Sequence, residues 1–181
     1  MGNPNRNRDI QLKIDAYGNM LFKLCLMRLQ NVQDAEDVVQ DVFYQYLKRE
    51  ESFESEEHEK AWLLKVAVNG CRRVWRSAWK RHRSGEDWQD VTAWLSERGT
   101  EEAVPDPEDY SLEKERRQQL LNAVMALPVK YRDVIHLFYY QQLSVKAIAE
   151  ITGRGQSTVT SQLTRGRELL RKSLKEEYDF A

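Results

Sequence analysis

Apolar residues recur at helical spacing in three stretches of the first half of the chain, and this pattern predicts three helices. They cover residues 10–30, 34–48 and 60–79, with a polar stretch over 49–59 between the second and the third. We expect Asp34 to cap the second helix, since an Asp side chain accepts an unpaired N–H group of the first turn. The apolar positions of that helix are Ala35, Val38, Val39, Val42, Phe43, Tyr46 and Leu47.

The second half of the chain shows the same helical spacing in shorter stretches. The Leu127–Pro128 step ends one helix, because a residue that precedes proline disfavours the α conformation. Ser144 is a suitable N-cap, and the Gly153–Gly155 segment marks a tight break before a last helix. A short helix, a glycine-bearing turn and a second helix form a helix-turn-helix arrangement. The predicted helices run from 112 to 126, from 131 to 140, from 144 to the break, and from 156 to about 174.

Residues 84–113 separate the two helical parts and differ from both in composition. They hold ten acidic residues, one basic residue and two prolines, Pro105 and Pro107, and they show no sustained apolar period. Such a stretch is typical of a linker. The sequence therefore predicts an all-α protein with two small helical domains, 1–83 and 114–181, joined by an acidic linker.

Composition excludes several classes of protein. Hydrophobic residues make up 41% of the 181 residues, with only 8 Gly and 4 Pro, so the chain is neither wholly disordered nor collagen-like. Cys25 and Cys71 lie in no CxxC or Cys/His cluster, and we expect reduced, buried thiols and neither a disulfide nor a metal site. No apolar run approaches the roughly 18 residues that span a membrane, and the polar N-terminus has no leader pattern. We expect a soluble, cytoplasmic protein without a cofactor.

The net charge of −1 is a sum of strongly opposed blocks. Residues 60–83 carry eight Lys or Arg and no acid, and residues 153–175 carry six against one acid, whereas residues 33–59 and the linker are strongly acidic. Uncompensated cations repel one another unless a polyanion is present, which favours nucleic acid as a partner. Tryptophans lie among the first group of cations, and they either stack on bases or fill the core; for Trp62 we favour the core.

The order of motifs along the chain indicates which family of nucleic-acid-binding proteins it resembles. The run Asp34–Phe43 (DAEDVVQDVF) resembles region 2.2 of bacterial RNA polymerase sigma factors, and Ala61–Arg73 (AWLLKVAVNGCRR) resembles regions 2.3 and 2.4. Leu127–Pro128, followed by Leu143–Gly153 (LSVKAIAEITG) and Thr158–Arg167 (TVTSQLTRGR), is similar to their region 4. With just these two modules, the chain resembles the extracytoplasmic-function sigma factors from about residue 9 to residue 175.

The resemblance implies a promoter-specificity subunit, not an enzyme, that binds core RNA polymerase through the β′ clamp and the β flap and directs transcription initiation. It implies contact with the promoter −10 element by Asn69, Arg72, Arg73, Arg76 and Lys80. It implies contact with the −35 element by Gln156, Ser157, Thr160, Ser161 and Arg165. It implies that the polymerase contacts Asp34, Asp37, Gln40 and Asp41. Family members are commonly held inactive by a membrane-anchored anti-sigma factor, so we expect such a partner as well.

Some positions depart from the family pattern. The segment 54–59, which in the family shapes the pocket for a −10 base, is strongly acidic here. Gly155 is a weaker cap than the usual Ser or Thr, and Gly166 replaces a usual Ala at a cost of about 1 kcal/mol in helix propensity. Thr160 and Gln162 occupy positions that are often basic in the family, which predicts fewer phosphate contacts and a different −35 sequence.

Two other kinds of protein remain as alternatives. A self-standing DNA-binding regulator would use only the helix-turn-helix and would dimerise on a palindromic site, leaving the 60–83 segment unexplained. An enzyme is disfavoured, because His58, His82 and His136 are scattered and no catalytic motif is present. The acidic linker is either a disordered tether or, by family analogy, a nucleic-acid mimic in the polymerase RNA path. We expect neutralisation of its acids to raise DNA affinity in the absence of polymerase.

Overall fold

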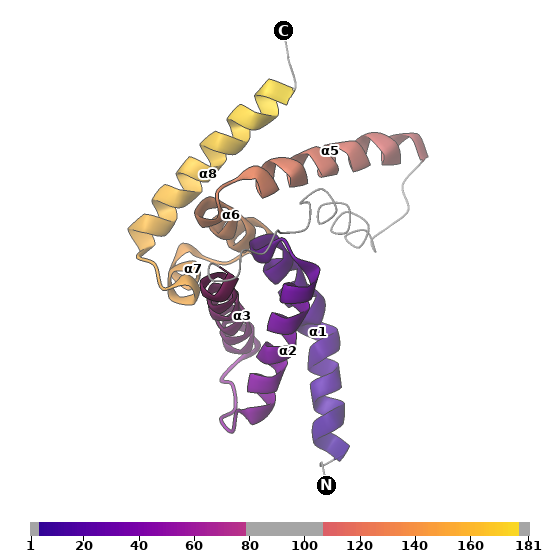
Figure 1. The fold of residues 1–181 in the computed structure, drawn as a ribbon, viewed down its shortest axis with the longest axis vertical. Coiled ribbons are helices and arrows are strands. Elements are labelled where there is room, and N and C mark those ends of the chain that lie inside the picture. Colours follow the sequence, from indigo (N-terminus) through magenta and orange to yellow (C-terminus); the bar gives the residue numbers. More distant parts are fainter. Residues whose placement is uncertain (1–3, 79–106, 178–181) are drawn as a thin grey trace. The chain divides into compact units, whose positions relative to one another are not determined.

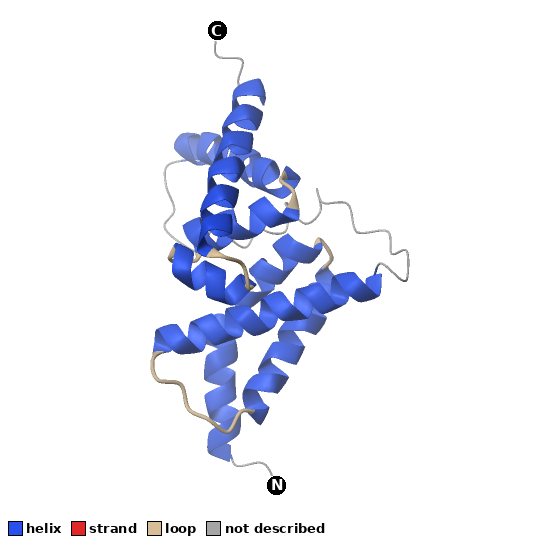
Figure 2. Ribbon diagram, turned by 90° about the vertical axis from the view of Figure 1, so that its left-hand side faces the viewer, coloured by secondary structure: helices blue, strands red, loops and turns tan. Residues whose placement is uncertain are grey.

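Every regular element in residues 4–78 and 107–177, the part of the chain that the computed structural model describes, is a helix (Figure 1, Figure 2). The all-α prediction is therefore confirmed. The chain divides into two units, Met1–Gly85 and Glu86–Ala181, and each is described on its own below. The linker residues up to 106, and the end of the first predicted domain from residue 79 onward, lie outside the described part, so the predicted domain boundaries stay a prediction.

The first unit consists of α1 (Pro4–Leu29), α2 (Val32–Lys48) and α3 (Glu56–Ala78), which pack against one another in all three pairings. Their shared core is formed by fully or almost fully buried apolar side chains. These include Leu21, Leu24, Val38, Val42, Leu63, Leu64 and Val68. Helices α2 and α3 pack closely at Gly70, because a Cβ atom built on this residue would lie 2.8 Å from Cγ1 of Val38.

The starts of α2 and α3 correct two expectations. Asn31, not Asp34, caps α2: its Oδ1 accepts the backbone N–H of Asp34 at 2.8 Å, and Asp34 lies in the first turn, where a negative charge is favourable. Helix α3 begins at Glu56, four residues before the predicted start, and Oγ of Ser55 accepts the N–H of His58 at 3.1 Å. Its first turn is acidic and carries no apolar period, so the pattern did not reveal it.

The second unit comprises α5 (Pro107–Ala126), α6 (Val129–Ile135), a π-helical turn η1 (His136–Tyr140), α7 (Val145–Thr152) and α8 (Gln156–Glu177). Residues 107–111, expected to belong to the linker alone, are helical, so α5 begins five residues before the predicted start at 112. Proline suits the first position of a helix, because its missing N–H has no partner there in any case. The expected end of this helix at the Leu127–Pro128 step is confirmed.

A buried arginine closes the junction between α5 and α6. Nη2 of Arg132 donates to the backbone carbonyls of Met125 and Leu127, each at 2.9 Å, and so satisfies acceptors that the end of a helix leaves unpaired. The single helix expected over 131–140 begins two residues earlier and widens into the π-helical turn at His136, which is buried.

The helix-turn-helix in the second unit has the predicted cap, break and start of α8, and α8 extends to Glu177, three residues beyond its predicted end. Oγ of Ser144 accepts the N–H of Ala147 at 3.1 Å, and α7 ends at Gly153, whose φ of +69° is a left-handed conformation that suits glycine. Helix α8 then packs against α6 and α7. A Cβ atom on Gly166 would lie 3.0 Å from Cγ1 of Ile135, so the small residue also serves close helix packing and does not only weaken the helix.

Candidate nucleic-acid and polymerase interface

Helix α3 presents a basic face. The side chains of Asn69, Arg73 and Arg76 are exposed and that of Arg72 is half-buried, and Nη1 of Arg72 lies 3.5 Å from Oδ1 of Asn69. These four residues, all predicted to contact the −10 element, therefore lie together within two turns of one helix. Lys80, the fifth, lies outside the described residues.

The acidic face of α2 borders the basic face of α3. Asp37 and Gln40 are exposed, and Asp34 and Asp41 are half-buried, so the four residues predicted to contact polymerase follow one side of the helix. Oδ2 of Asp41 accepts hydrogen bonds from Nε2 of Gln45 at 3.0 Å and from Nη2 of Arg73 at 2.9 Å. The two predicted surfaces thus meet at one ion pair.

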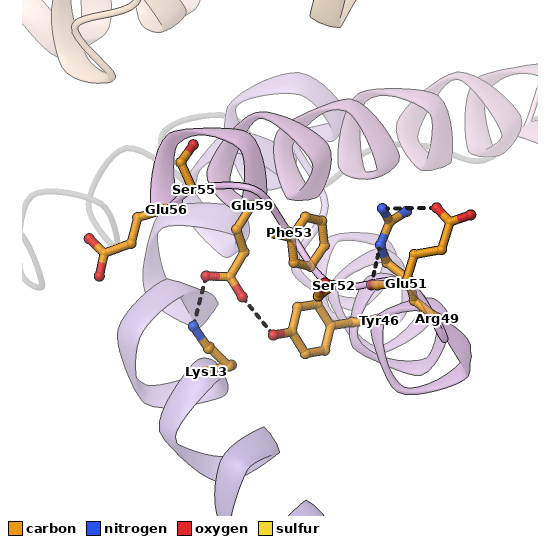
Figure 3. Close-up of a pocket in the computed structure, with 9 residues that line it drawn as sticks. All are labelled: Lys13, Tyr46, Arg49, Glu51, Ser52, Phe53, Ser55, Glu56 and Glu59. Carbon is orange, nitrogen blue, oxygen red and sulfur yellow. Dashed lines mark hydrogen bonds and ion pairs between the residues drawn. The ribbon is translucent and has the colours of Figure 1, made fainter.

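A cavity of about 470 Å³ opens where the loop between α2 and α3 folds back on α1 (Figure 3). Its wall is aromatic on one side, where the rings of Tyr46 and Phe53 stack with centroids 5.8 Å apart. Trp62 packs behind them, 5.6 Å from Phe53, and the guanidinium of Arg49 lies 4.5 Å from the Phe53 ring. The lining residues are Lys13, Tyr46, Arg49, Glu51, Ser52, Phe53, Ser55, Glu56 and Glu59.

This cavity bears on two expectations about the −10 site. Trp62 is half-buried and belongs to the aromatic cluster behind the cavity, so it is neither a fully buried core residue nor an exposed stacking platform. Asn69 does not line the cavity, because it lies almost three turns further along α3 than Glu59. The amide and the cavity are therefore separate features of the first unit.

Glu59 is a buried carboxylate at the base of this cavity and joins all three helices of the first unit. It accepts hydrogen bonds from Nζ of Lys13 at 2.7 Å, from the hydroxyl of Tyr46 at 2.6 Å and from that of Tyr17 at 3.2 Å; Figure 3 shows it between Lys13 and Tyr46. Burial alone would raise the pKa of Glu59, but the hydrogen bonds from Lys13 and Tyr46 outweigh it and lower that pKa. Burial and the bond to Glu59 raise the pKa of Tyr46.

Sequence reasoning missed this role of Glu59. In the sequence Glu59 is one of several acids in the segment 54–59, whereas in the structure only 4% of its surface is accessible. Its partners Lys13, Tyr17 and Tyr46 lie 46, 42 and 13 residues away along the chain, so the local sequence around Glu59 does not reveal them.

In the second unit, the start of α8 and the start of α6 form a groove of about 370 Å³. Three of the residues predicted to read the −35 element line it, namely Ser157, Ser161 and Arg165. Gln156 and Thr160 do not, and the Thr160 hydroxyl donates to the Gln156 carbonyl at 3.0 Å. The groove is completed by Lys130, Tyr131, Thr158 and Gln162.

Comparison with known proteins shows to which family the chain belongs. The family model for sigma-70 region 2 matches residues 14–81, and that for sigma-70 region 4 matches residues 117–170. The chain is 31% identical over 169 residues to the ECF RNA polymerase sigma factor SigW of Bacillus subtilis, covering 90% of this chain and 87% of the relative. The chain belongs to the extracytoplasmic-function sigma factors of bacterial RNA polymerase.

Other relatives agree. An ECF RNA polymerase sigma-E factor of Haemophilus influenzae is 30% identical over 91% of this chain and 86% of its own length. Among solved structures, the sigma factor RpoE of Bartonella quintana in complex with the anti-sigma factor NepR has a TM-score of 0.60 at 22% identity, covering 93% of this chain and 98% of that one. CnrH in complex with the cytosolic domain of CnrY has a TM-score of 0.61 at 20% identity, covering 97% and 91%. These two likenesses concern the fold.

This sigma factor is therefore a promoter-specificity subunit that binds core RNA polymerase and promoter DNA and directs transcription initiation; it is not itself an enzyme. The family resemblance drawn from the sequence motifs is confirmed. The alternative of a regulator that uses only its helix-turn-helix is set aside, because residues 14–81 match sigma-70 region 2. Within the described residues, no helix is long and apolar enough to cross a membrane, and no group of metal-ligating side chains occurs.

Proposed function

We propose that the first unit captures the unpaired −10 element and docks on core polymerase, while the second unit reads the −35 element as duplex DNA. In the first unit, the −10 contacts are Asn69, Arg72, Arg73, Arg76 and Lys80, and the polymerase contacts are Asp34, Asp37, Gln40 and Asp41. In the second, the −35 contacts are Gln156, Ser157, Thr160, Ser161 and Arg165.

The observation that carries this proposal is that α3 holds only positive charges beyond its first turn. From Lys60 to Ala78 the helix carries five Lys or Arg and no acid, and the three arginines flank an exposed amide at Asn69. Cations bind phosphates without regard to sequence, and an amide offers both a donor and an acceptor to a base edge. The face is therefore suited to a single strand whose backbone lies along the arginines.

The cavity beside the loop between α2 and α3 supports capture of a flipped base. Its volume of about 470 Å³ falls within the range of small-molecule sites, and the aromatic rings of Tyr46 and Phe53 line one side of it. The exposed carboxylates of Glu51 and Glu56 at its rim disfavour a phosphate, so a nucleobase and not the backbone would enter.

The acidic side of α2 is suited to a basic partner surface. We assign it to the β′ clamp, as the family resemblance implies, and we assign the β flap to the second unit on the same ground. Electrostatic complementarity of this kind accelerates association and selects the partner. The protein acts where polymerase and genome meet, in the cytoplasm. Since the structural neighbours were solved with anti-sigma factors, we extend such a partner to this chain, with membrane anchoring residing in that partner.

Run-off transcription with purified core polymerase and a promoter library tests the proposal. The double substitution Arg72→Ala and Arg76→Ala is expected to abolish permanganate-reactive thymines in the −10 element while leaving polymerase binding intact. The control replaces Arg116 and Arg117, two exposed cations of α5 outside the proposed surfaces, with alanine, which removes equal charge. Absence of any specific transcript with the unmodified protein, or equal loss of melting in both variants, would refute the assignment.

A further inference from the structure

Arg154 lies in the turn of the helix-turn-helix and connects three segments of the second unit. Its Nη2 donates to Oδ2 of Asp133 at 3.0 Å, and its Nη1 donates to the Lys130 carbonyl at 3.2 Å and to Oε1 of Gln162 at 3.0 Å. The Asp133 carboxylate is fully buried and the Arg154 side chain is 19% exposed, so solvent competes little for this pair. The guanidinium is thereby fixed against α6 before it meets Gln162.

The contact with Arg154 fixes the orientation of the Gln162 amide. A guanidinium has five N–H donors and no acceptor, so the amide must turn its oxygen toward Arg154 and its NH₂ group away from it. Gln162 also lines the groove between α6 and α8, together with Ser161 and Arg165. The part of the amide turned toward a ligand in this groove is therefore its NH₂ group, which carries two donors.

A fixed amide reads a base edge differently from a free one. An unconstrained glutamine pairs with adenine by accepting from N6 and donating to N7, and this contact needs both its oxygen and its nitrogen. Arg154 occupies one of the two lone pairs of that oxygen, so the oxygen is a weaker acceptor for a base and the NH₂ group is the stronger contact that Gln162 offers. In the major groove, guanine presents two acceptors, N7 and O6, and thymine presents one, O4, whereas adenine pairs its N7 acceptor with a donor and cytosine presents only a donor.

We propose that Gln162 is a specificity-determining residue for the −35 element, and that Asp133 and Arg154 are positioning residues that turn its oxygen toward Arg154 and its NH₂ group toward the groove. This inference rests on the proposed function of the second unit. The base that Gln162 contacts is then preferably guanine or thymine and not cytosine, and the two-bonded contact with adenine is weakened because its acceptor is shared with Arg154. Gln162 thus supplies an uncharged donor at a position that is often basic in the family.

The test is transcription by core polymerase with the full chain from a promoter library randomised in the −35 element, scored base by base. Gln162→Glu keeps the size and the bond from Arg154 but presents an acceptor to the groove. It is expected to shift preference at one position toward cytosine, whose N4 amino group donates, by about 3- to 10-fold, the value of one hydrogen bond. Arg171→Gln, an exposed change further along α8, is the control and leaves each preference unchanged.

A second variant tests the positioning residues. Arg154→Met together with Asp133→Asn releases the amide without leaving a buried charge unpaired, and it is expected to raise the preference for adenine at that same position. If this variant shifts nothing while Gln162→Glu does, the role of Arg154 is refuted. If Gln162→Glu lowers transcription equally on every sequence, the specificity role is refuted while the proposed function stands. If the unmodified protein shows no dependence on the −35 sequence, the proposed function fails, and this inference fails with it.

Discussion

Arg73 on α3 and Asp41 on α2 form an ion pair, with Nη2 and Oδ2 2.9 Å apart. The pair joins a residue that we assign to DNA with one that we assign to polymerase. Their side chains are 59% and 44% exposed, so water screens the pair and its net contribution to stability is small. Both groups are consequently available to external partners at little energetic cost to the fold.

This availability predicts separable effects of the two residues. Asp41→Asn is expected to weaken binding to core polymerase by about tenfold, because the acidic side of α2 loses a charge at its centre. Arg73→Gln is expected to leave that affinity unchanged and to reduce the yield of open complex. Both variants should change the free energy of unfolding by less than about 1 kcal/mol. Equilibrium binding to fluorescently labelled polymerase and permanganate footprinting measure the two effects. The same defect in both variants would contradict the assignment.

Glu59→Gln is expected to destabilise the first unit by about 2–3 kcal/mol, the value of hydrogen bonds to a buried charged acceptor. The amide would turn either its NH₂ group or a weaker, uncharged acceptor toward Lys13. Chemical denaturation measures the change. Glu57→Gln, an exposed acid in the same turn of α3, is the matched control and should have an effect near zero. Equal stability of the two variants would show that the carboxylate is not a structural hub.

The same carboxylate predicts an acid-sensitive step in stability. The folded-state pKa of Glu59 is below its unfolded-state value, so its stabilising contribution is complete above the unfolded-state value and is lost as the pH falls through the folded-state pKa. We expect stability to decline below the ordinary carboxyl value of about 4.5. In Glu59→Gln this part of the decline should be absent. Denaturation midpoints measured from pH 7 to pH 3 in both proteins would reveal the difference, and parallel curves would count against it.

Gly70→Ala is expected to cost about 1–3 kcal/mol, because the added methyl group would lie 2.8 Å from Cγ1 of Val38 in the packed contact of α2 and α3. The second change Val38→Ala should recover part of the loss through relief of that clash. Gly18→Ala serves as the control: its Cβ atom would meet Ile14 at an ordinary 3.6 Å, and helix propensity should make it neutral or stabilising. Thermal unfolding compares the variants, and a neutral Gly70→Ala would show that the helices can separate.

Ser144→Ala is expected to destabilise the second unit by about 1 kcal/mol, because the N–H of Ala147 loses its side-chain acceptor at the start of α7. Ser144→Asp retains an acceptor and adds a favourable charge at the helix N-terminus, so it should keep the stability of the original protein. Hydrogen exchange of the α7 amides measures the effect locally. Equal exchange rates in the alanine and aspartate variants would contradict the capping role.

The helices could be predicted from apolar spacing, but their first turns could not. Helix α3 begins with acidic residues at Glu56, and α5 begins at Pro107 inside a segment whose composition is that of a linker. Apolar spacing records only residues that face a core, and the first turn of an exposed helix faces solvent. The cap of α2 was misplaced for a related reason, since Asn31 and Asp34 are both good caps and the apolar period starts beside the second.

The candidate sites divide in a similar way. Residues adjacent on one helix, such as Asn69 with Arg72, could be grouped from the sequence alone. Groups assembled from separate helices could not, because nothing in the local pattern of α8 reveals that Arg154 turns the Gln162 amide or that Lys130 borders the same groove. The polar partners of Glu59 were invisible for the same reason.

The turn that holds Arg154 also affects the thermodynamics of promoter search. Arg154 bonds this turn to α6 through Asp133 and the Lys130 carbonyl, and to α8 through Gln162, so α6, the turn and the start of α8 are already joined in the absence of DNA. Binding then requires little loss of conformational entropy in the protein, and most of the free energy of a matched contact remains to distinguish right from wrong sequences. We therefore expect rapid dissociation from mismatched DNA sequences, since these joined segments do not adjust their conformation to fit them.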